Sequence, residues 1–163
     1  MKIRTGFGYD VHAFAHGRAL WLGGIRIDHP LGLAGHSDAD VLIHAICDAL
    51  LGAAGLRDIG YHFPDTADEY RGIDSKILLA RTMALLHDAG YELGNVDATI
   101  VAEQPKLSPH IPQMRQTLAE TMQVDPADIS IKATTTEKLG FTGRNEGIAA
   151  CAAVLILPAN HTN

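Results

Sequence analysis

The stretch IAACAAVLIL, residues 148–157, holds ten consecutive apolar residues and no charged one. A strand that is apolar at every position is typical of a sheet covered on both faces. The run is too short to cross a bilayer, since a membrane-spanning helix needs about 20 apolar residues. We therefore predict that this stretch forms a strand that is buried on both faces.

Four further strands are predicted, at residues 3–9, 19–27, 95–103 and 128–135. The clearest is NVDATIVAE, residues 95–103, because its apolar side chains alternate with polar ones as in a half-buried strand. Gly23 and Gly24 mark a turn or a bulge. Residues 58–71 show no period and contain Pro64, which predicts a long loop of functional importance or mobility.

Three helices are predicted between these strands. ADVLIHAICDALLGAAG, residues 39–55, is rich in Ala and Leu, with Ser37 or Asp38 as its cap and Gly55 at its end. A second helix runs over residues 74–89, and Ser108 with Pro109 opens a third.

The alternation of strands and helices predicts one domain, residues 1–163, of the α/β (α+β layered) class. Its helices pack on one face of a mixed β-sheet. Because three helices can cover only one face, we predict that the other face lies at an interface between subunits. A long loop over that face would satisfy the same pattern.

The overall composition limits the partners that the protein can have. Its 163 residues include 13 Lys and Arg against 19 Asp and Glu, a net charge of −6, which argues against a nucleic-acid binder. The first residues lack the apolar stretch of a secretory signal, and the two cysteines form no disulfide framework. These features predict a cytoplasmic protein without a membrane partner.

Histidine and aspartate residues gather in the first part of the chain and suggest a metal site. Six of the nine histidines precede residue 63. Asp10 and His12 stand two apart at the end of the predicted strand 3–9, where side chains at this spacing point to the same side. With His44 they would form a three-ligand set that leaves one tetrahedral position open. Asp40 and Asp48 stand four residues either side of His44, so one of them could orient its second ring nitrogen, and Asp48 is proposed for this role. Turn hydrogen bonds and a core histidine are the alternative.

Two other segments carry groups that suit phosphate or a nucleotide. KATTTEKLGFTGRNEGI, residues 132–148, ends a strand with three threonines followed by cationic side chains, and Glu137 offers an oxygen ligand for magnesium. AEQPKLSPHIPQM, residues 102–114, is a strand-to-helix turn whose backbone could grip a base and whose Lys106 could meet a phosphate. A polar hairpin and an ordinary helix start are the alternatives.

Six blocks in order carry a family resemblance: residues 8–14, 34–60, 63–66, 95–100, 103–114 and 132–148. Together they resemble the 2-C-methyl-D-erythritol 2,4-cyclodiphosphate synthases, and the match runs from Ile3 to about Leu157. The resemblance implies conversion of 4-diphosphocytidyl-2-C-methyl-D-erythritol 2-phosphate to the cyclic diphosphate and CMP. It also implies a homotrimer with active sites between subunits.

The resemblance implies roles for individual residues. Zn²⁺ would be bound by Asp10, His12 and His44, and Glu137 would bind a second ion, Mg²⁺ or Mn²⁺. His36 and Thr135 would stabilise the transition state. The implied substrate contacts are Ser37, Asp58, Ile59, Gly60, Phe63, Asp65, Ala102, Pro105, Lys106, Leu107, Ser108, Thr134, Phe141 and Arg144.

Two other functions fit parts of the sequence. A zinc hydrolase would use the open metal position to activate water. A trimeric binding protein for an isoprenoid or a nucleotide would use the Asp-His-His set for structure only. Structural zinc sites usually have four protein ligands, often thiolates, and the two cysteines are too far apart in the chain to provide them.

Overall fold

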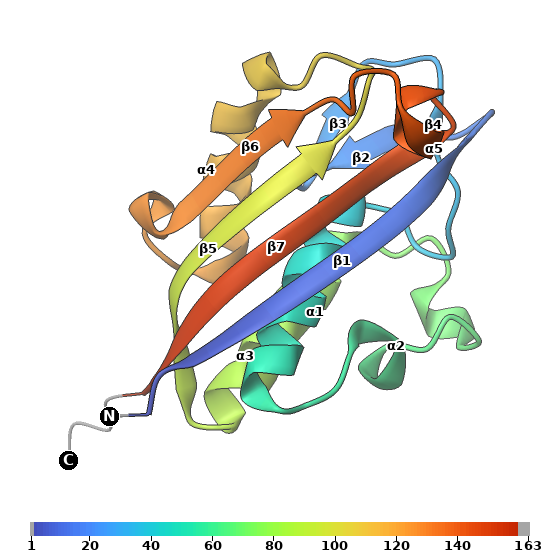
Figure 1. The fold of residues 1–163 in the computed structure, drawn as a ribbon. Helices are drawn as coiled ribbons and strands as arrows, with labels where there is room; N and C mark the ends of the chain where they lie inside the picture. Colours follow the sequence, from blue (N-terminus) through green and yellow to red (C-terminus); the bar gives the residue numbers. More distant parts are fainter. Residues whose placement is uncertain (1, 160–163) are drawn as a thin grey trace.

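A five-stranded mixed sheet forms the centre of the fold in a computed structural model, which describes residues 2–159. The strands lie in the order β4-β1-β7-β5-β6 (Figure 1). Their bounds are β1 Arg4–Ala15, β4 Gly32–Leu33, β5 Tyr91–Val101, β6 Ile129–Thr134 and β7 Gly147–Pro158. Strands β5 and β6 run parallel, and the other neighbours are antiparallel. The predicted mixed sheet is therefore confirmed.

Three long helices lie on one face of this sheet (Figure 1). They are α1 Val41–Ala54, α3 Ser75–Asp88 and α4 Ile111–Met122. Shorter elements are the strands β2 Leu20–Leu22 and β3 Ile25–Ile27, the helices α2 Ile59–His62 and α5 Gly140–Gly143, and the 3₁₀ turns η1 Asp68–Tyr70, η2 Ser108–His110 and η3 Pro126–Asp128. The layered arrangement agrees with the prediction. Among the helices of residues 2–159, none is both long and apolar enough to cross a membrane.

Two glycines of β1 allow α1 to lie directly against the strand. A Cβ atom on Gly8 would stand 1.9 Å from the carbonyl oxygen of Ala45, and one on Gly6 would stand 1.9 Å from that of Ala49. No larger residue fits without moving the helix or the strand. This close contact brings the first turns of α1 next to the part of β1 that carries Asp10 and His12.

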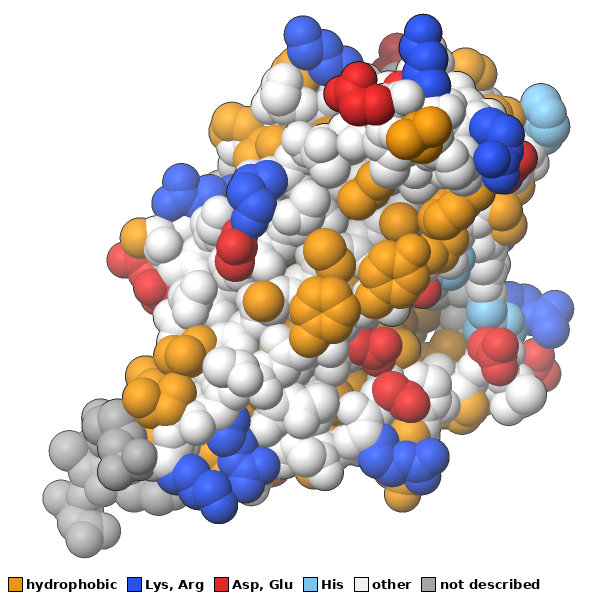
Figure 2. Space-filling view, viewed as in Figure 1, with side chains coloured by type: hydrophobic (Ala, Val, Ile, Leu, Met, Phe, Trp, Pro, Cys, Tyr) orange, Lys and Arg blue, Asp and Glu red, His pale blue; other side chains and the backbone are white. Residues whose placement is uncertain are grey.

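The second face of the sheet has no long helix over it. Side chains of β1 alternate between the two faces, so Phe7 and Tyr9 point away from the helices and are 68% and 55% exposed. Figure 2 shows apolar side chains gathered along this face, with charged groups mainly toward its margins. On β7, Ile148 and Ala150 are buried beneath the helices, whereas Ala153 on the other face is exposed. Within one chain, the helices thus bury one face of β7 and leave the other face uncovered.

Some predicted boundaries differ from the structure for physical reasons. The first strand extends to Ala15 rather than residue 9, because its pairing with β7 continues to Ala13 and then passes to β4. The predicted strand 19–27 is a hairpin, since Gly23 and Gly24 both have positive φ, as a two-residue hairpin turn requires. The predicted loop 58–71 contains α2 and η1.

The start of α1 also differs from the prediction. Neither Ser37 nor Asp38 caps it: the cap is Asp40, whose carboxylate accepts a hydrogen bond from the backbone N–H of Ile43 at 3.1 Å. Asp40 is fully buried and also accepts from the N–H groups of Gly23 at 3.0 Å and Gly24 at 2.7 Å. The cap therefore ties the β2–β3 turn to α1.

Candidate functional site

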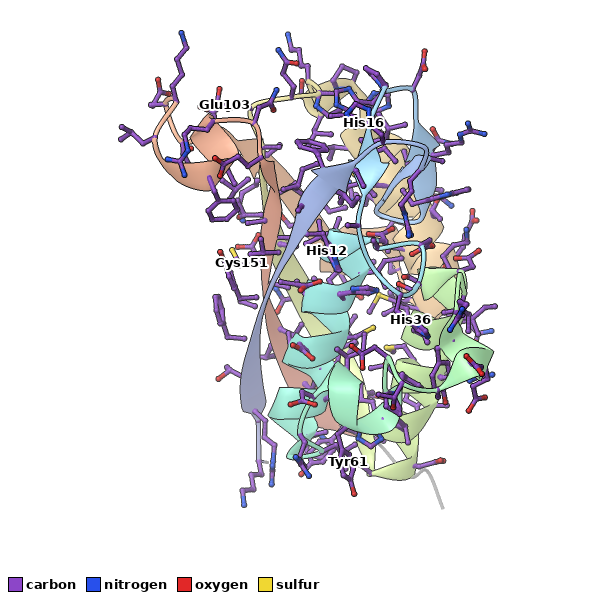
Figure 3. The ribbon with its side chains drawn as sticks, turned by 90° about the vertical axis from the view of Figure 1, so that its right-hand side faces the viewer. His12, His16, His36, Tyr61, Glu103 and Cys151 are labelled. Carbon is purple, nitrogen blue, oxygen red and sulfur yellow. The ribbon has the colours of Figure 1, made fainter. Side chains whose placement is uncertain are left out.

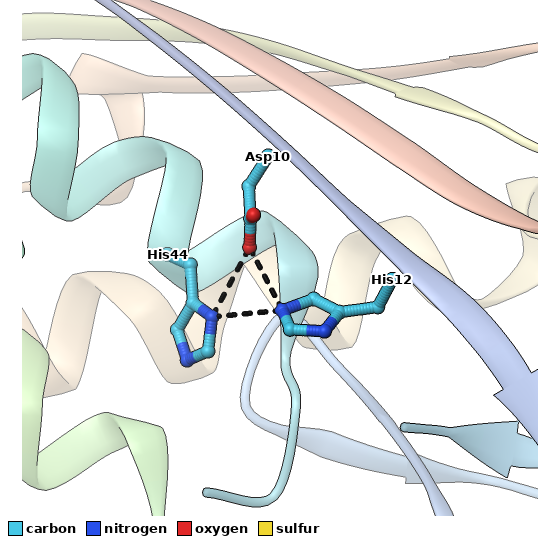
Figure 4. Close-up of side chains that lie close together, drawn as sticks. All are labelled: Asp10, His12 and His44. Carbon is cyan, nitrogen blue, oxygen red and sulfur yellow. Dashed lines mark hydrogen bonds and ion pairs between the residues drawn. The ribbon is translucent and has the colours of Figure 1, made fainter. Parts of the chain in front are cut away.

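Asp10, His12 and His44 form one cluster between β1 and α1 (Figure 4). The Oδ2 atom of Asp10 lies 2.9 Å from Nε2 of His12 and 3.1 Å from Nδ1 of His44. The two ring nitrogens are 3.2 Å apart. Three donor atoms, predicted from the sequence as one set, thus point toward a common centre.

Groups behind the cluster orient both imidazole rings. Nδ1 of His12 lies 2.6 Å from the carbonyl oxygen of Ala34, which can only accept, so this nitrogen carries the proton. Nε2 of His44 lies 3.0 Å from Oγ of Ser75 and 3.1 Å from Oγ of Ser37. The remaining nitrogen of each ring faces Asp10. This is how histidine ligands are usually held in protein metal sites.

The electrostatics of the cluster keep Asp10 ionised. Burial by itself raises the pKa of this carboxyl, but its contacts with His12 and His44 outweigh burial and hold the pKa well below its ordinary value. Burial opposes the charged form of His12, while its contacts with Asp10 raise the pKa of the ring. Asp10 therefore presents a carboxylate oxygen at neutral pH.

The donor set fits a zinc ion. Two imidazole nitrogens and one carboxylate oxygen are common zinc ligands, and three protein ligands leave a coordination position for another molecule. All three donor atoms lie within 4.8 Å of one another. The side chains of Asp10 and His44 remain 27% and 13% exposed, so the cluster is open on one side.

The cluster opens into a cavity of about 370 Å³, the first cavity, between β1, α1 and the segment after α1. Its lining includes six of the predicted substrate and catalytic positions, namely His36, Ser37, Ile59, Gly60, Phe63 and Asp65. Figure 3 shows His12 and His36 on the helix side of β1, whereas Cys151 lies on the other side. Tyr70 also lines the cavity, and its ring packs edge-on against Phe63 at 5.7 Å.

A second cavity of about 390 Å³ lies at the ends of β5 and β6. These strands are parallel, so their carboxyl ends meet at one edge, where Val101 pairs with Thr134. The predicted residues that line this cavity are Ala102, Pro105, Lys106, Leu107, Ser108, Thr134 and Thr135. The structure therefore places the two groups of predicted contacts in two cavities.

The comparisons with known proteins agree with this geometry. The model of the YgbB family matches residues 3–157. This chain belongs to the YgbB family. The 2-C-methyl-D-erythritol 2,4-cyclodiphosphate synthase of Parabacteroides distasonis is 77% identical over 156 residues, which cover 96% of this chain and 97% of that protein. The resemblance seen in the six sequence blocks is thereby confirmed.

Solved structures similar to this YgbB chain show the same fold. The bifunctional IspDF of Campylobacter jejuni gives a TM-score of 0.95 at 43% identity over 99% of this chain, which spans 44% of that longer protein. The IspF of Plasmodium falciparum, solved as a CDP complex, gives 0.85 at 35% identity, with 97% of each chain covered.

Several predicted residues of the YgbB chain line neither cavity. Glu137 follows β6 with φ of 54°, and its backbone N–H donates to Oγ1 of Thr135 at 3.2 Å. Phe141 lies in α5, and Arg144 pairs with Glu146 at 2.9 Å. Asp58 caps α2 by accepting from the N–H of Tyr61 at 2.9 Å.

The most consequential separation is that of His36 from Thr135. Within residues 2–159, His36 lines the first cavity and Thr135 lines the second, so one chain does not bring the two together. Both residues were assigned to one reaction by the family resemblance.

The prediction that Asp48 orients His44 is wrong. Oδ1 of Asp48 accepts a hydrogen bond from the N–H of Ile59 at 2.8 Å, and Ser37 and Ser75 hold the outer nitrogen of His44 instead. Sequence reasoning missed Ser75, because it lies 31 residues from His44 and no local pattern connects them. Tyr70 and Leu78 were missed for the same reason, whereas Glu103, which lines the second cavity, lies inside the quoted stretch 102–114 and was not singled out there.

Neither cysteine takes part in the cluster. Cys47 is fully buried in α1, and burial raises the pKa of its thiol to about 12, so it is not a nucleophile at neutral pH. Cys151 lies on the open face of β7, away from both cavities. Among residues 2–159, the donor atoms that meet in the cluster are therefore histidine nitrogens and a carboxylate oxygen.

Proposed function

We propose that this chain converts 4-diphosphocytidyl-2-C-methyl-D-erythritol 2-phosphate to 2-C-methyl-D-erythritol 2,4-cyclodiphosphate and CMP. One observation carries the proposal: three zinc-type donors open into a cavity lined by His36, Ser37 and Asp65, in a chain whose relatives are named for this synthase. A cavity of about 370 Å³ lies in the range of small-molecule sites.

The reaction is an intramolecular phosphoryl transfer. An oxygen of the 2-phosphate forms a bond to the β-phosphorus, the bond from that phosphorus to the oxygen shared with the α-phosphate breaks, and its electron pair leaves with CMP. The nucleophile is already anionic near neutral pH, so no strong base is required. Holding both phosphates in line removes the entropic cost of bringing two molecules together.

Charge is the main obstacle, because two anionic groups must approach each other in a protein of net charge −6. When bound, a zinc ion on Asp10, His12 and His44 and a magnesium or manganese ion at Glu137 supply Lewis acidity and charge neutralisation. The chain's own residues act beside these ions. Ser37 and the backbone of residues 59–60 hold the sugar phosphate in the first cavity, and Lys106 attracts phosphate in the second.

His36 and Thr135 donate hydrogen bonds to phosphate oxygens as charge shifts during the transfer. Donors of this kind are worth about 10²–10³-fold in rate when they are aimed at the developing charge. Each is positioned by its own surroundings: Nε2 of His36 lies 3.1 Å from the carbonyl of Ala67, and Oγ1 of Thr135 accepts from the N–H of Glu137. The reaction needs both residues at one substrate.

A homotrimer with shared sites is part of the proposal, because the first and second cavities lie apart in one chain. The first cavity of one subunit then meets the second cavity of a neighbour, which unites His36 with Thr135. The uncovered sheet face supplies the contact: Phe7, Tyr9 and Val11 are apolar and exposed there. An exposed apolar patch of this kind is typical of an interface.

Phosphorus NMR tests the proposed reaction directly. The purified protein is given the 2-phosphorylated diphosphocytidyl substrate and Mg²⁺, with and without a zinc chelator. We expect signals of CMP and a cyclic diphosphate, which disappear on chelation. Release of inorganic phosphate would indicate a zinc hydrolase instead. An unchanged spectrum with zinc bound would indicate a binding protein.

A further inference from the structure

Ser75, the first residue of α3, is fully buried between Asp38 and His44. Its Oγ lies 2.5 Å from Oδ1 of Asp38 and 3.0 Å from Nε2 of His44. We propose that Ser75 and Asp38 form a relay that positions His44 for metal binding, with Ser75 as the positioning residue. This inference rests on the proposed zinc site and names the groups that tune it.

The chemistry of the three groups sets the direction of each hydrogen bond. The carboxylate of Asp38 can only accept, so the hydroxyl of Ser75 donates its proton to Asp38. A lone pair of the same oxygen then faces Nε2 of His44, which must donate. With its proton on Nε2, the ring presents the lone pair of Nδ1 to the centre that Asp10 shares. The relay thus selects the tautomer that a metal requires.

The carboxylate of Asp38 is itself held in place. Its Oδ2 accepts the backbone N–H of Ser75 at 2.9 Å, and its Oδ1 also accepts that of Asp40 at 3.2 Å. The N–H of Asp38 donates to the carbonyl of Ile73 at 3.1 Å. A negative charge at the start of α3 is stabilised by the helix dipole. A fixed, charged acceptor makes the Ser75 hydroxyl a stronger partner for His44.

Ser37 lies equally near His44 but is placed differently. Its Oγ accepts the N–H of Ala39 at 3.1 Å, and within residues 2–159 no carboxylate accepts its proton. Ser37 also lines the first cavity, where Ser75 is absent from the lining. The two hydroxyls therefore divide their roles: Ser37 is free to turn to a bound molecule, while Ser75 keeps His44 oriented.

A purely structural role for Ser75 would be to cap α3, but Asp74 already does this. Asp74 is the N-cap, and its carboxylate accepts the N–H of Lys76 at 2.9 Å. Asp74 has no hydrogen bond to His44 or to Asp38 among the described residues. Asp74→Ala is therefore a matched control that weakens the same helix start and leaves the relay intact.

Zinc affinity, measured by competition with a chromophoric chelator, tests the relay. We expect Ser75→Ala to bind zinc about 10- to 100-fold more weakly than the unaltered protein, the usual effect of removing a group behind a histidine ligand. Asp38→Asn, which keeps the side-chain size, should weaken zinc binding about tenfold, at the low end of that range. Asp74→Ala should bind zinc as the unaltered protein does.

A proton NMR spectrum of the zinc-loaded protein gives a second measurement. The Nε2 proton of His44 should be downfield and protected from exchange in the unaltered protein and in Asp74→Ala, and should exchange rapidly in Ser75→Ala. If Ser75→Ala does not fold, the zinc affinity of Asp38→Asn alone tests the relay. Unchanged zinc affinity in a folded relay variant would overturn the inference. Failure of the unaltered protein to bind zinc would instead overturn the proposed function.

Discussion

The two cavities of this chain are built in different ways. The first takes its chemistry from side chains on regular elements, with Asp10 and His12 on β1 and His44 on α1, and each ring is fixed from behind. The second lies where β5 and β6 end, and it is lined by residues of the segment 102–108, among them Lys106, and by Ala133, Thr134 and Thr135. The first is suited to holding a metal at fixed distances, and the second to gripping a ligand.

The two cavities therefore offer different groups to a ligand. Within residues 2–159 the only group of three metal-type donors is the Asp10, His12 and His44 cluster, so the second cavity has no comparable centre. The first cavity lacks the threonines that follow β6. If both act on one substrate, we expect them to come from different copies of the chain, because one chain places His36 and Thr135 in separate cavities.

The substitution His44→Ala is the strongest test of the difference between the two cavities. We expect loss of bound zinc and a fall in turnover of at least about 10³-fold, since the first cavity loses a ligand while the second is untouched. Metal content by mass spectrometry and turnover by phosphorus NMR measure both effects. Nucleotide binding, measured by calorimetry with CDP, should change little, and full activity in this variant would refute the metal assignment.

A mixing experiment tests whether the cavities are shared between chains. His44→Ala and Thr135→Ala each disable one cavity, so each variant alone should be nearly inactive. Unfolded together in equal amounts and refolded, they should regain about one quarter of wild-type activity, because half of each cavity type is intact and pairing is random. Each variant refolded alone is the control. A mixture that stays inactive would place both cavities of a site on one chain.

An effect of intermediate size is expected from a substitution of Glu137, the predicted magnesium ligand. Glu137→Gln removes the charge but keeps the shape, and Glu137 lies beside Thr135 rather than near the zinc donors. We expect the Mg²⁺ concentration for half-maximal activity to rise about tenfold, as for loss of one charged ligand, while zinc stays bound. Overlapping Mg²⁺ titrations of the variant and wild type would remove Glu137 from the site.

The smallest effect is expected from changing the contact that sets the first cavity's spacing. Gly8→Ala places a Cβ 1.9 Å from the carbonyl of Ala45, so α1 must shift, and stability should fall by about 1–3 kcal/mol as in overpacked cores. Urea unfolding with and without zinc measures the change. Gly52→Ala, in the same helix with open space at its Cβ, should keep or slightly raise stability.

Local patterns in the sequence predicted much of the fold and the site. Alternation identified β5, the apolar run identified β7, and the Asp-x-His spacing placed two donors on one side of a strand. These features depend on neighbours within a few residues, which is the range where periodicity is informative. The substrate contacts came instead from the family resemblance; most of them line one of the two cavities, whereas Asp58, Phe141 and Arg144 line neither.

Other features depend on partners that are distant in sequence. Asp40 rather than Ser37 or Asp38 caps α1, because the glycine turn of a hairpin 16 residues away supplies two further N–H donors. Ser75 replaces Asp48 behind His44, because α3 packs beside α1. The extension of β1 beyond residue 9 depends on its pairing with β7, near the other end of the chain, as far as Ala13, and with β4 for Phe14 and Ala15. Local patterns in a single sequence do not predict such contacts between distant residues.

The side chains of strand β1 alternate between two faces that have different roles. Its even positions, Gly6, Gly8, Asp10 and His12, specify the helix contact and the ligands, while its odd positions, Phe7, Tyr9 and Val11, specify the uncovered surface. Because strand side chains alternate strictly, deleting Thr5 while Arg4 keeps its pairing would move every later side chain of β1 to the opposite face. The aromatic rings would meet α1 and the ligands would face outward. A substitution can therefore alter one face of β1 alone, whereas a one-residue change in its length alters both.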